Sequence, residues 1–151
     1  MSSRAEIVAE ARSWIGTPFR HQATLKNVGV DCAGLVRGTA VNTGCLQADY
    51  RHLPRAAEFL DYARSPDGIA MLEACEMYMV RISQDAMQPG DAILLRFEKD
   101  PQHLGILGDY RHGGLSIIHA ASNAGRVIET RLMFGPRTMQ FVAAFALPGV
   151  A

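Results

Sequence analysis

The stretch that decides the fold is Gly29-Val30-Asp31-Cys32-Ala33-Gly34-Leu35-Val36, which places a cysteine at the start of a predicted helix. Asp31 is a suitable N-cap, and the apolar pattern after it continues at helical spacing to about Gly44. Cys32 then occupies the first helical position, where the helix dipole and unpaired backbone N–H groups stabilise the thiolate over the thiol. Cys32 is therefore a candidate nucleophile; the alternative is a small buried packing residue.

Two glycines, Gly34 and Gly38, lie one turn apart on this helix. Each costs about 1 kcal/mol relative to alanine in a helix interior, and together they leave a strip without side chains. The spacing predicts that another layer of the protein packs closely on this strip.

The segment before this stretch predicts a first helix and a loop. Ser3-Arg4-Ala5-Glu6 has the pattern of a capping box, and apolar residues follow at helical spacing from Ile7 to Ile15. Gly16-Thr17-Pro18 interrupts that pattern, so residues 16–30 are expected to form a surface loop.

The segment after it changes from helical to strand-like patterns. We expect helices at about 55–63 and 68–75 and a short strand at 77–82. Five further strands are expected at the end of the chain, at residues 92–97, 104–108, 115–121, 126–132 and 141–147. Their short connections favour antiparallel pairing, because a parallel crossover needs a dozen or more residues. The predicted class is α+β, with helices first and an antiparallel sheet after them.

Length and composition exclude several classes of protein. The 151 residues are 48% hydrophobic, with 15 basic and 15 acidic side chains, which predicts one globular domain over 1–151 and no general binding to nucleic acid. No apolar run approaches the ~20 residues of a spanning helix, and charged residues near the start argue against a signal peptide. The three cysteines are odd in number and lack a CxxC pair, so we expect no disulfide framework and no zinc ribbon. Cys45 and Cys75 are expected to be packing residues.

Two histidines could supply a base. If the strands around 104–108 and 115–121 form a hairpin with its turn near residue 111 or 112, His103 lies opposite His119 or one residue away. Such neighbours are about 5 Å apart at Cβ, so one imidazole can orient the other. The alternative is two polar residues on a half-exposed strand face. The combination with Cys32 favours acyl transfer through a cysteine nucleophile.

Several stretches together resemble the ordered motifs of the NlpC/P60 cysteine peptidases, and specifically of the phage cell-wall peptidase branch. They are Trp14-Ile15-Gly16-Thr17-Pro18-Phe19-Arg20-His21-Gln22, the stretch 29–36, Gln88-Pro89-Gly90-Asp91, His103-Leu104-Gly105-Ile106 and Ile117-Ile118-His119-Ala120. The resemblance covers residues 5 to 145 and is weakest at 45–85, which suggests a helical insertion there.

This resemblance implies a papain-like fold, with N-terminal helices packed on a five- to six-stranded antiparallel sheet. It also implies that Cys32 is the nucleophile, that His103 is the general base and acid, and that His119 orients His103. The implied substrates are peptidoglycan stem peptides, cut between D-γ-glutamyl and a diamino acid. No metal or organic cofactor is implied.

One departure from the family pattern concerns the substrate-binding or oxyanion group. Phe19 stands where many members have tyrosine, so one hydroxyl donor is missing, and Arg20 or His21 would have to replace it. Asp31 is also a candidate for substrate binding or for the oxyanion site, but its expected role is to cap the helix. Four arginines are candidate clamps for substrate carboxylates: Arg20, Arg37, Arg51 and Arg96.

Three functions follow as hypotheses. The first is a cysteine endopeptidase that opens peptidoglycan, made in the cytoplasm and delivered to the periplasm by a phage tail or phage-like particle. The second is a catalytically weak structural module of a tail tip that contacts a hub or baseplate protein or murein. The third is acyl transfer to lipid or amine acceptors on the same scaffold.

Overall fold

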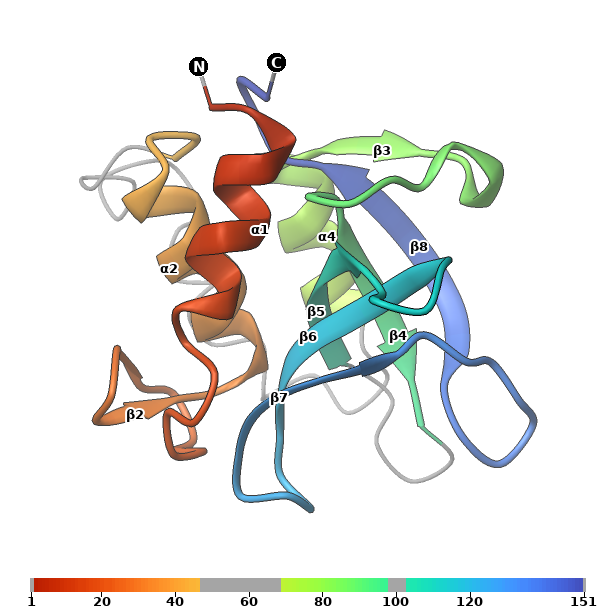
Figure 1. The fold of residues 1–151 in the computed structure, drawn as a ribbon. Coiled ribbons are helices and arrows are strands. Elements are labelled where there is room, and N and C mark those ends of the chain that lie inside the picture. Colours follow the sequence, from red (N-terminus) through yellow and green to blue (C-terminus); the bar gives the residue numbers. More distant parts are fainter. Residues whose placement is uncertain (1, 47–68, 98–102, 151) are drawn as a thin grey trace.

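The computed structural model describes residues 2–46, 69–97 and 103–150, and the predicted helix at 55–63 lies outside these ranges. The described chain has three α-helices and a six-stranded antiparallel sheet, which confirms the α+β class (Figure 1). The helices α1 and α2 lie side by side on one face of the sheet, and α4 packs near its β8 strand.

Helix α1 spans Arg4–Arg12 and begins with the predicted capping box. The Ser3 side chain accepts a hydrogen bond from the Glu6 backbone N–H, and the Glu6 side chain accepts one from the Ser3 backbone. The helix ends three residues earlier than the apolar pattern suggested, and Ile15 is exposed. The chain leaves the helix here because Gly16 donates its backbone N–H to Val127 in the sheet.

Helix α2 spans Cys32–Asn42, with Asp31 as its N-cap. Its residues from Cys32 to Ala40 are all buried, because the helix packs against α1 on one side and against strands β5 and β6 on another. Close packing on both sides is consistent with the small residues that this helix carries.

Residues 16–30 form more than the expected loop. A two-stranded antiparallel hairpin, β1 (Thr24–Leu25) and β2 (Gly29–Val30), lies directly before α2. Val30 also pairs with Phe19 in an isolated bridge. The prediction missed this hairpin because two-residue strands carry no recognisable alternation.

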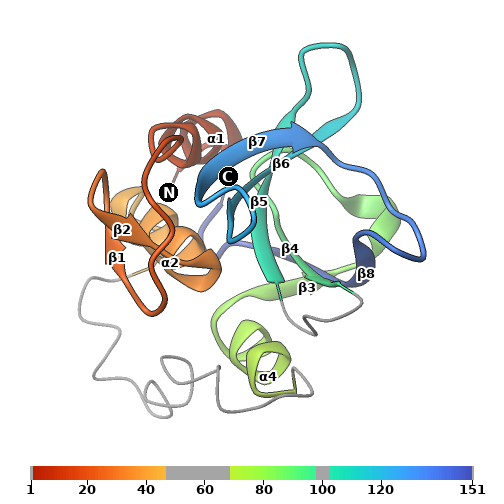
Figure 2. The same ribbon diagram turned by 90° about the horizontal axis from the view of Figure 1, so that it is seen from below.

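The strands of the large sheet are β3 (Val80–Ile82), β4 (Ala92–Arg96), β5 (His103–Asp109), β6 (Leu115–Ala121), β7 (Arg126–Arg131) and β8 (Gln140–Ala146). Their order in space is β3-β8-β4-β5-β6-β7, with all neighbours antiparallel. Figure 2 shows the sheet strongly curved, with β7 at the edge beside α1. The predicted strand at 77–82 is only partly correct, because helix α4 (Ile69–Tyr78) continues to residue 78.

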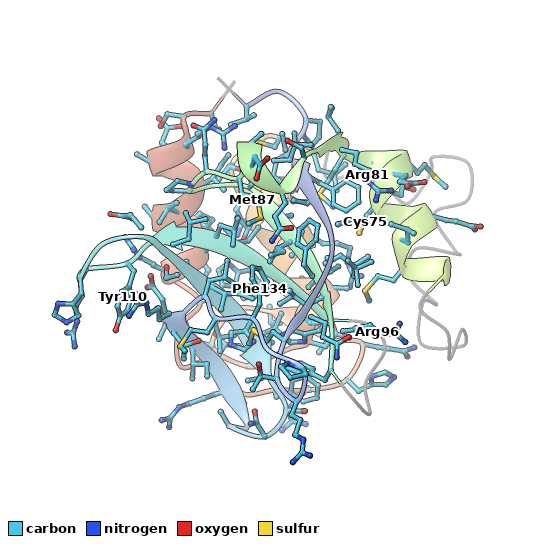
Figure 3. All side chains as sticks on the ribbon, turned by 90° about the vertical axis from the view of Figure 1, so that its right-hand side faces the viewer. Cys75, Arg81, Met87, Arg96, Tyr110 and Phe134 are labelled. Carbon is cyan, nitrogen blue, oxygen red and sulfur yellow. The ribbon has the colours of Figure 1, made fainter. Side chains whose placement is uncertain are left out.

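The sheet buries an apolar cluster on each face. Alternate residues such as Leu104, Ile106 and Ile118 join the core under α1 and α2. The intervening residues, including Leu107 and Ile117, form a smaller cluster on the other face. On that second face Phe134 packs against Phe141, with ring centroids 6.1 Å apart (Figure 3).

No helix in the described ranges is long and apolar enough to cross a membrane.

Candidate active site

Cys32 is held at the first position of α2 by the cap that precedes it. One oxygen of the Asp31 carboxylate accepts a hydrogen bond from the Gly34 backbone N–H at 2.8 Å, and the other accepts one from the Gln22 backbone N–H at 2.7 Å. Asp31 is 1% exposed, so both bonds are shielded from water. The carboxylate therefore fixes both the helix start and the loop beside it, as expected of a cap.

The two helix glycines are where the protein packs most closely against α2. A Cβ atom on Gly34 would lie 2.4 Å from the backbone oxygen of Ala23, and one on Gly38 would lie 2.4 Å from the Trp14 ring. The predicted close packing is confirmed. The chain before Cys32 is thereby pressed onto the helix that carries it.

The histidine pair is present, although its register differs from the prediction. Strands β5 and β6 pair Ile106 with Ile118 and Asp109 with Leu115. Continued along the strands, this register places His119 opposite Gly105, so His103 and His119 are diagonal neighbours. Their side chains still meet, since diagonal positions on one face lie within reach of aromatic rings.

The two imidazoles form a buried hydrogen bond. The Nε2 atom of His103 lies 2.7 Å from the Nδ1 atom of His119, and the rings meet edge to face with centroids 4.9 Å apart. Each histidine is about 5% exposed or less. The other ring nitrogen of His119, Nε2, is buried and has no partner among the described residues.

One cavity brings the thiol and both histidines together. It has a volume of about 620 Å³, within the range of ligand-binding pockets, and Cys32, His103 and His119 all line it. The three residues come from the start of α2, the start of β5 and the end of β6. The three residues therefore line the same cavity.

Burial determines the protonation of the two histidines. Loss of water, together with the smaller effect of the neighbouring His119, lowers the pKa of His103 to about 3. Burial alone lowers the pKa of His119 to about 4. Both imidazoles are therefore neutral at pH 7, the form in which a ring nitrogen can accept a proton.

The other predicted site residues divide into two groups. Phe19, His21 and Asp31 line the cavity. Arg20 does not, and its aliphatic chain lies against Gly29 instead. Of the candidate carboxylate clamps, Arg37 bonds to Thr24 and Arg96 is exposed at the end of β4, both away from the cavity lining, while Arg51 lies outside the described residues.

Sequence reasoning missed eight of the fourteen described residues that line the cavity. The additional residues come from strands β6 and β7, the loop between them and the residues next to β4 and β8: Phe97, Ala120, Ala121, Ser122, Asn123, Ile128, Thr130 and Met139. Phe97 also contacts the His103 ring, with centroids 5.0 Å apart. Because most of these positions lack a distinctive side chain, only the strand register could have indicated them.

The remaining cysteines are consistent with packing. Cys75 is fully buried in the core under α2, and burial raises the pKa of its thiol to about 12, with a further contribution from Cys32. Cys45 is half-buried and packs against the same core. Among the residues that the structure describes, no group of three His, Cys, Asp or Glu side chains could hold a metal ion.

The comparison with protein families gives a match over most of the chain. Residues 16–143 match the model of the NlpC/P60 family. The chain belongs to the NlpC/P60 family. The matched range contains the α2 cysteine and both cavity histidines, and it confirms the resemblance to the family seen in the sequence motifs.

Solved structures with this fold confirm the architecture of an NlpC/P60 domain. The NlpC/p60 domain of the peptidoglycan hydrolase SagA is 23% identical, with a TM-score of 0.53 and coverage of 85% of this chain and 89% of that one. NlpC1 from Trichomonas vaginalis is 15% identical with a TM-score of 0.67, and the match covers 97% of this chain but 45% of that one. An N-acetylmuramoyl-L-alanine amidase from Bacteroides uniformis is 10% identical with a TM-score of 0.60, and the match covers 95% of this chain and 98% of that one. No curated protein matches the chain.

Proposed function

We propose that this NlpC/P60 protein is a cysteine endopeptidase that hydrolyses peptidoglycan stem peptides between D-γ-glutamyl and a diamino acid. The observation that carries the proposal is the single cavity that holds a helix-capped cysteine and a hydrogen-bonded pair of neutral histidines. The family membership supports the substrate class, and the choice of bond follows from the sequence resemblance.

The first chemical step is attack by the Cys32 sulfur on the amide carbonyl. His103 accepts the thiol proton, the carbon–sulfur bond forms, and the carbonyl oxygen takes the negative charge. The backbone N–H of Cys32 lies at the first position of α2, where the positive end of the helix dipole favours the developing charge on that oxygen. His103 then gives the proton to the leaving amine, and water releases the acyl group.

His119 determines which nitrogen of His103 does this work. If His103 carries its ring proton on Nε2 and donates it to Nδ1 of His119, then Nδ1 of His103 is left as the proton acceptor. The short contact also fixes the orientation of the His103 ring. His119 is therefore a positioning residue.

The test is a digestion of murein followed by mass spectrometry of the muropeptides. We expect wild type to release products cut at the D-γ-glutamyl bond and Cys32→Ala to leave them intact. Cys45→Ala is a matched control, because Cys45 lies outside the cavity lining. If wild type leaves the stem peptides uncut under conditions where it is folded, the enzymatic proposal is wrong and the structural-module hypothesis takes its place.

Hydrolysis and acyl transfer differ in what releases the acyl group. A digestion with an added amine such as glycinamide would yield the amide adduct if transfer dominates, whereas hydrolysis yields the free acid. Delivery by a phage tail or phage-like particle, action in the periplasm and contact with a hub protein stay predictions from the sequence resemblance.

A further inference from the structure

A second groove adjoins the catalytic cavity along the edge of the sheet. It has a volume of about 690 Å³, and Thr130 of β7 lines both this groove and the cavity. We call it the edge groove; its other walls are the end of β5 with the turn after it (109–111), Arg12 of α1, and Glu129 and Arg131 on either side of Thr130. A ligand that extends from the cavity across β7 enters this groove directly.

The backbone of β7 is open along the groove. At Val127 both outward-facing backbone groups are occupied, because Val127 donates to Thr17 and accepts from Gly16. Glu129 and Arg131 follow at spacings of two and face the same way. No backbone group in the described ranges bonds to them on that side. The loop at 16–19 therefore covers the edge only as far as the cavity, and beyond it the edge can accept another strand.

The charge of the groove favours an anion. Its two carboxylates, on Glu129 and Asp109, both pair with Arg12, at 2.9 and 3.1 Å, and the three arginines of the lining outnumber these carboxylates by one. Two more arginines remain. Arg131 stands over the Tyr110 ring at 5.9 Å, and Arg111 is exposed in the turn; neither has a carboxylate partner among the described residues. In a chain with no net charge, this leaves a local excess of positive charge beside the site.

We propose that the edge groove binds a second, extended peptide arm of cross-linked peptidoglycan, with its free carboxylates on Arg131 and Arg111. This inference rests on the proposed function, since it assigns a part of the same substrate to the groove. Backbone amides of the arm pair with Glu129 and Arg131, as in strand addition to a sheet edge. Tyr110 lies at the margin of the face seen in Figure 3, where it holds the guanidinium of Arg131 toward the groove.

A peptide fits this surface better than a sugar chain does. An open strand edge presents alternating N–H and C=O groups, which match an extended amide chain. Among the described residues that line the groove, only Tyr110 has an aromatic ring, and the Arg131 guanidinium already stands over it. Stem peptides also carry carboxylates, which arginine binds with charge-assisted hydrogen bonds.

The binding test uses the uncleavable full-length Cys32→Ala protein. Two probes are titrated into the 15N-labelled protein: a disaccharide-tetrapeptide monomer and the peptide-cross-linked dimer, both from diaminopimelate-containing murein. We expect the dimer to shift the Glu129 and Arg131 amide resonances and to slow their hydrogen exchange, and the monomer to leave both unchanged. Shifts confined to residues of the catalytic cavity with the dimer would overturn the inference.

The kinetic test separates the groove from the cavity. In the otherwise wild-type enzyme, Arg111→Gln with Arg131→Gln should raise KM for the dimer by about tenfold and leave kcat/KM for the monomer unchanged. Arg81→Gln, an exposed arginine on the opposite edge strand β3, is the matched control and should change neither. An equal loss on both probes would contradict the inference, as would no loss on the dimer.

The two proposals fail in distinguishable ways. Amide shifts at Glu129 and Arg131 in the Cys32→Ala protein do not require cleavage, so they support the groove even if wild type fails to hydrolyse murein. Conversely, wild-type cleavage at the expected bond without these shifts supports the proposed function and overturns the groove.

Discussion

The Asp31 carboxylate ties the loop at Gln22 to the start of α2, because it accepts the Gln22 backbone N–H at 2.7 Å while it caps the helix through Gly34. Gln22 is one of two non-glycine residues with positive φ in the described chain, at 60°, so this bond helps to hold a less favourable backbone conformation. The cavity residues Phe19 and His21 lie just before it. One buried carboxylate thus positions two walls of the site.

Replacing Asp31 should therefore affect both stability and turnover. We expect Asp31→Ala to lower the free energy of unfolding by about 2 to 4 kcal/mol, because it removes the helix cap and leaves a shielded N–H unpaired. Asp31→Asn retains one acceptor oxygen and should lose about half as much. Urea unfolding measures the free energy of unfolding of both variants. Equal stability of Asp31→Ala and wild type would show that the two bonds contribute nothing net.

His119 should matter for turnover more than for binding. We expect His119→Ala to lower kcat by about a hundredfold with little change in KM, because the His103 ring loses its orienting partner. His119→Gln should recover part of this loss, since its amide can still accept a hydrogen bond from His103. Steady-state kinetics on a soluble muropeptide gives both constants. A larger effect on KM than on kcat would place His119 in substrate binding instead.

The buried histidines should make the protein sensitive to acid. Their pKa values in the fold, about 3 and about 4, lie below the ordinary value of 6.5, so the unfolded chain binds more protons than the folded chain between these limits. Above pH 6.5 the two histidines leave the free energy of unfolding unchanged. As the pH falls below 6.5, each histidine lowers the free energy of unfolding by up to about 1.4 kcal/mol per pH unit. Unfolding free energies from pH 7 to 5 test this, because the lowered pKa values of Glu10 and Glu129 confine their contributions to more acid conditions.

Two variants identify the groups responsible. His119→Gln should flatten the dependence between pH 7 and 5, whereas His112→Gln, at an exposed turn position, should leave it unchanged. A profile that does not change with His119→Gln would assign the acid sensitivity to other groups. In activity assays, the same low pKa values predict that the base form of His103 persists well below pH 6.5.

The helix glycines provide a test of packing. Glycine to alanine in an uncrowded helix usually stabilises a protein by about 0.4 to 1 kcal/mol. At Gly34 and Gly38 we expect the opposite sign, a loss of about 1 to 3 kcal/mol, because the new methyl group would meet Ala23 or Trp14 at 2.4 Å. Gly34→Ala should be the more harmful, since its neighbour is a backbone oxygen that cannot rotate away. Thermal unfolding of the two variants gives the comparison.

Much of this architecture was predictable from local sequence signals. The capping box of α1, the Asp31 cap of α2 and the strand β6 at Leu115–Ala121 are short-range features, and the residues themselves specify them. The hairpin β1–β2 was missed because its strands are too short for a period to emerge. The full strand order was also beyond reach, since short connections indicate hairpins such as β5–β6 but not the pairing of β8 with β3 and β4.

The residues of the site likewise divide into those that the sequence indicates and those that depend on the tertiary structure. Cys32, His103 and His119 were found because thiol and imidazole side chains are chemically distinctive. Phe19 and His21 were found through the motif at 14–22 that resembles the family, and Asp31 because it directly precedes Cys32. The contact between His103 and His119 was predicted with a register one or two residues off. Other lining residues, such as Thr130 and Met139, reach the cavity only because the sheet curves, and no local sequence pattern predicts that curvature.

The position of β8 has a consequence for how this protein is made. The strand that follows all the others among the described residues lies in the interior of the sheet, between β3 and β4. Until it emerges from the ribosome, both neighbours present bare edges, and the nascent chain is exposed to intermolecular strand pairing. We therefore expect C-terminal truncations that remove β8 to yield insoluble protein, rather than a smaller folded domain.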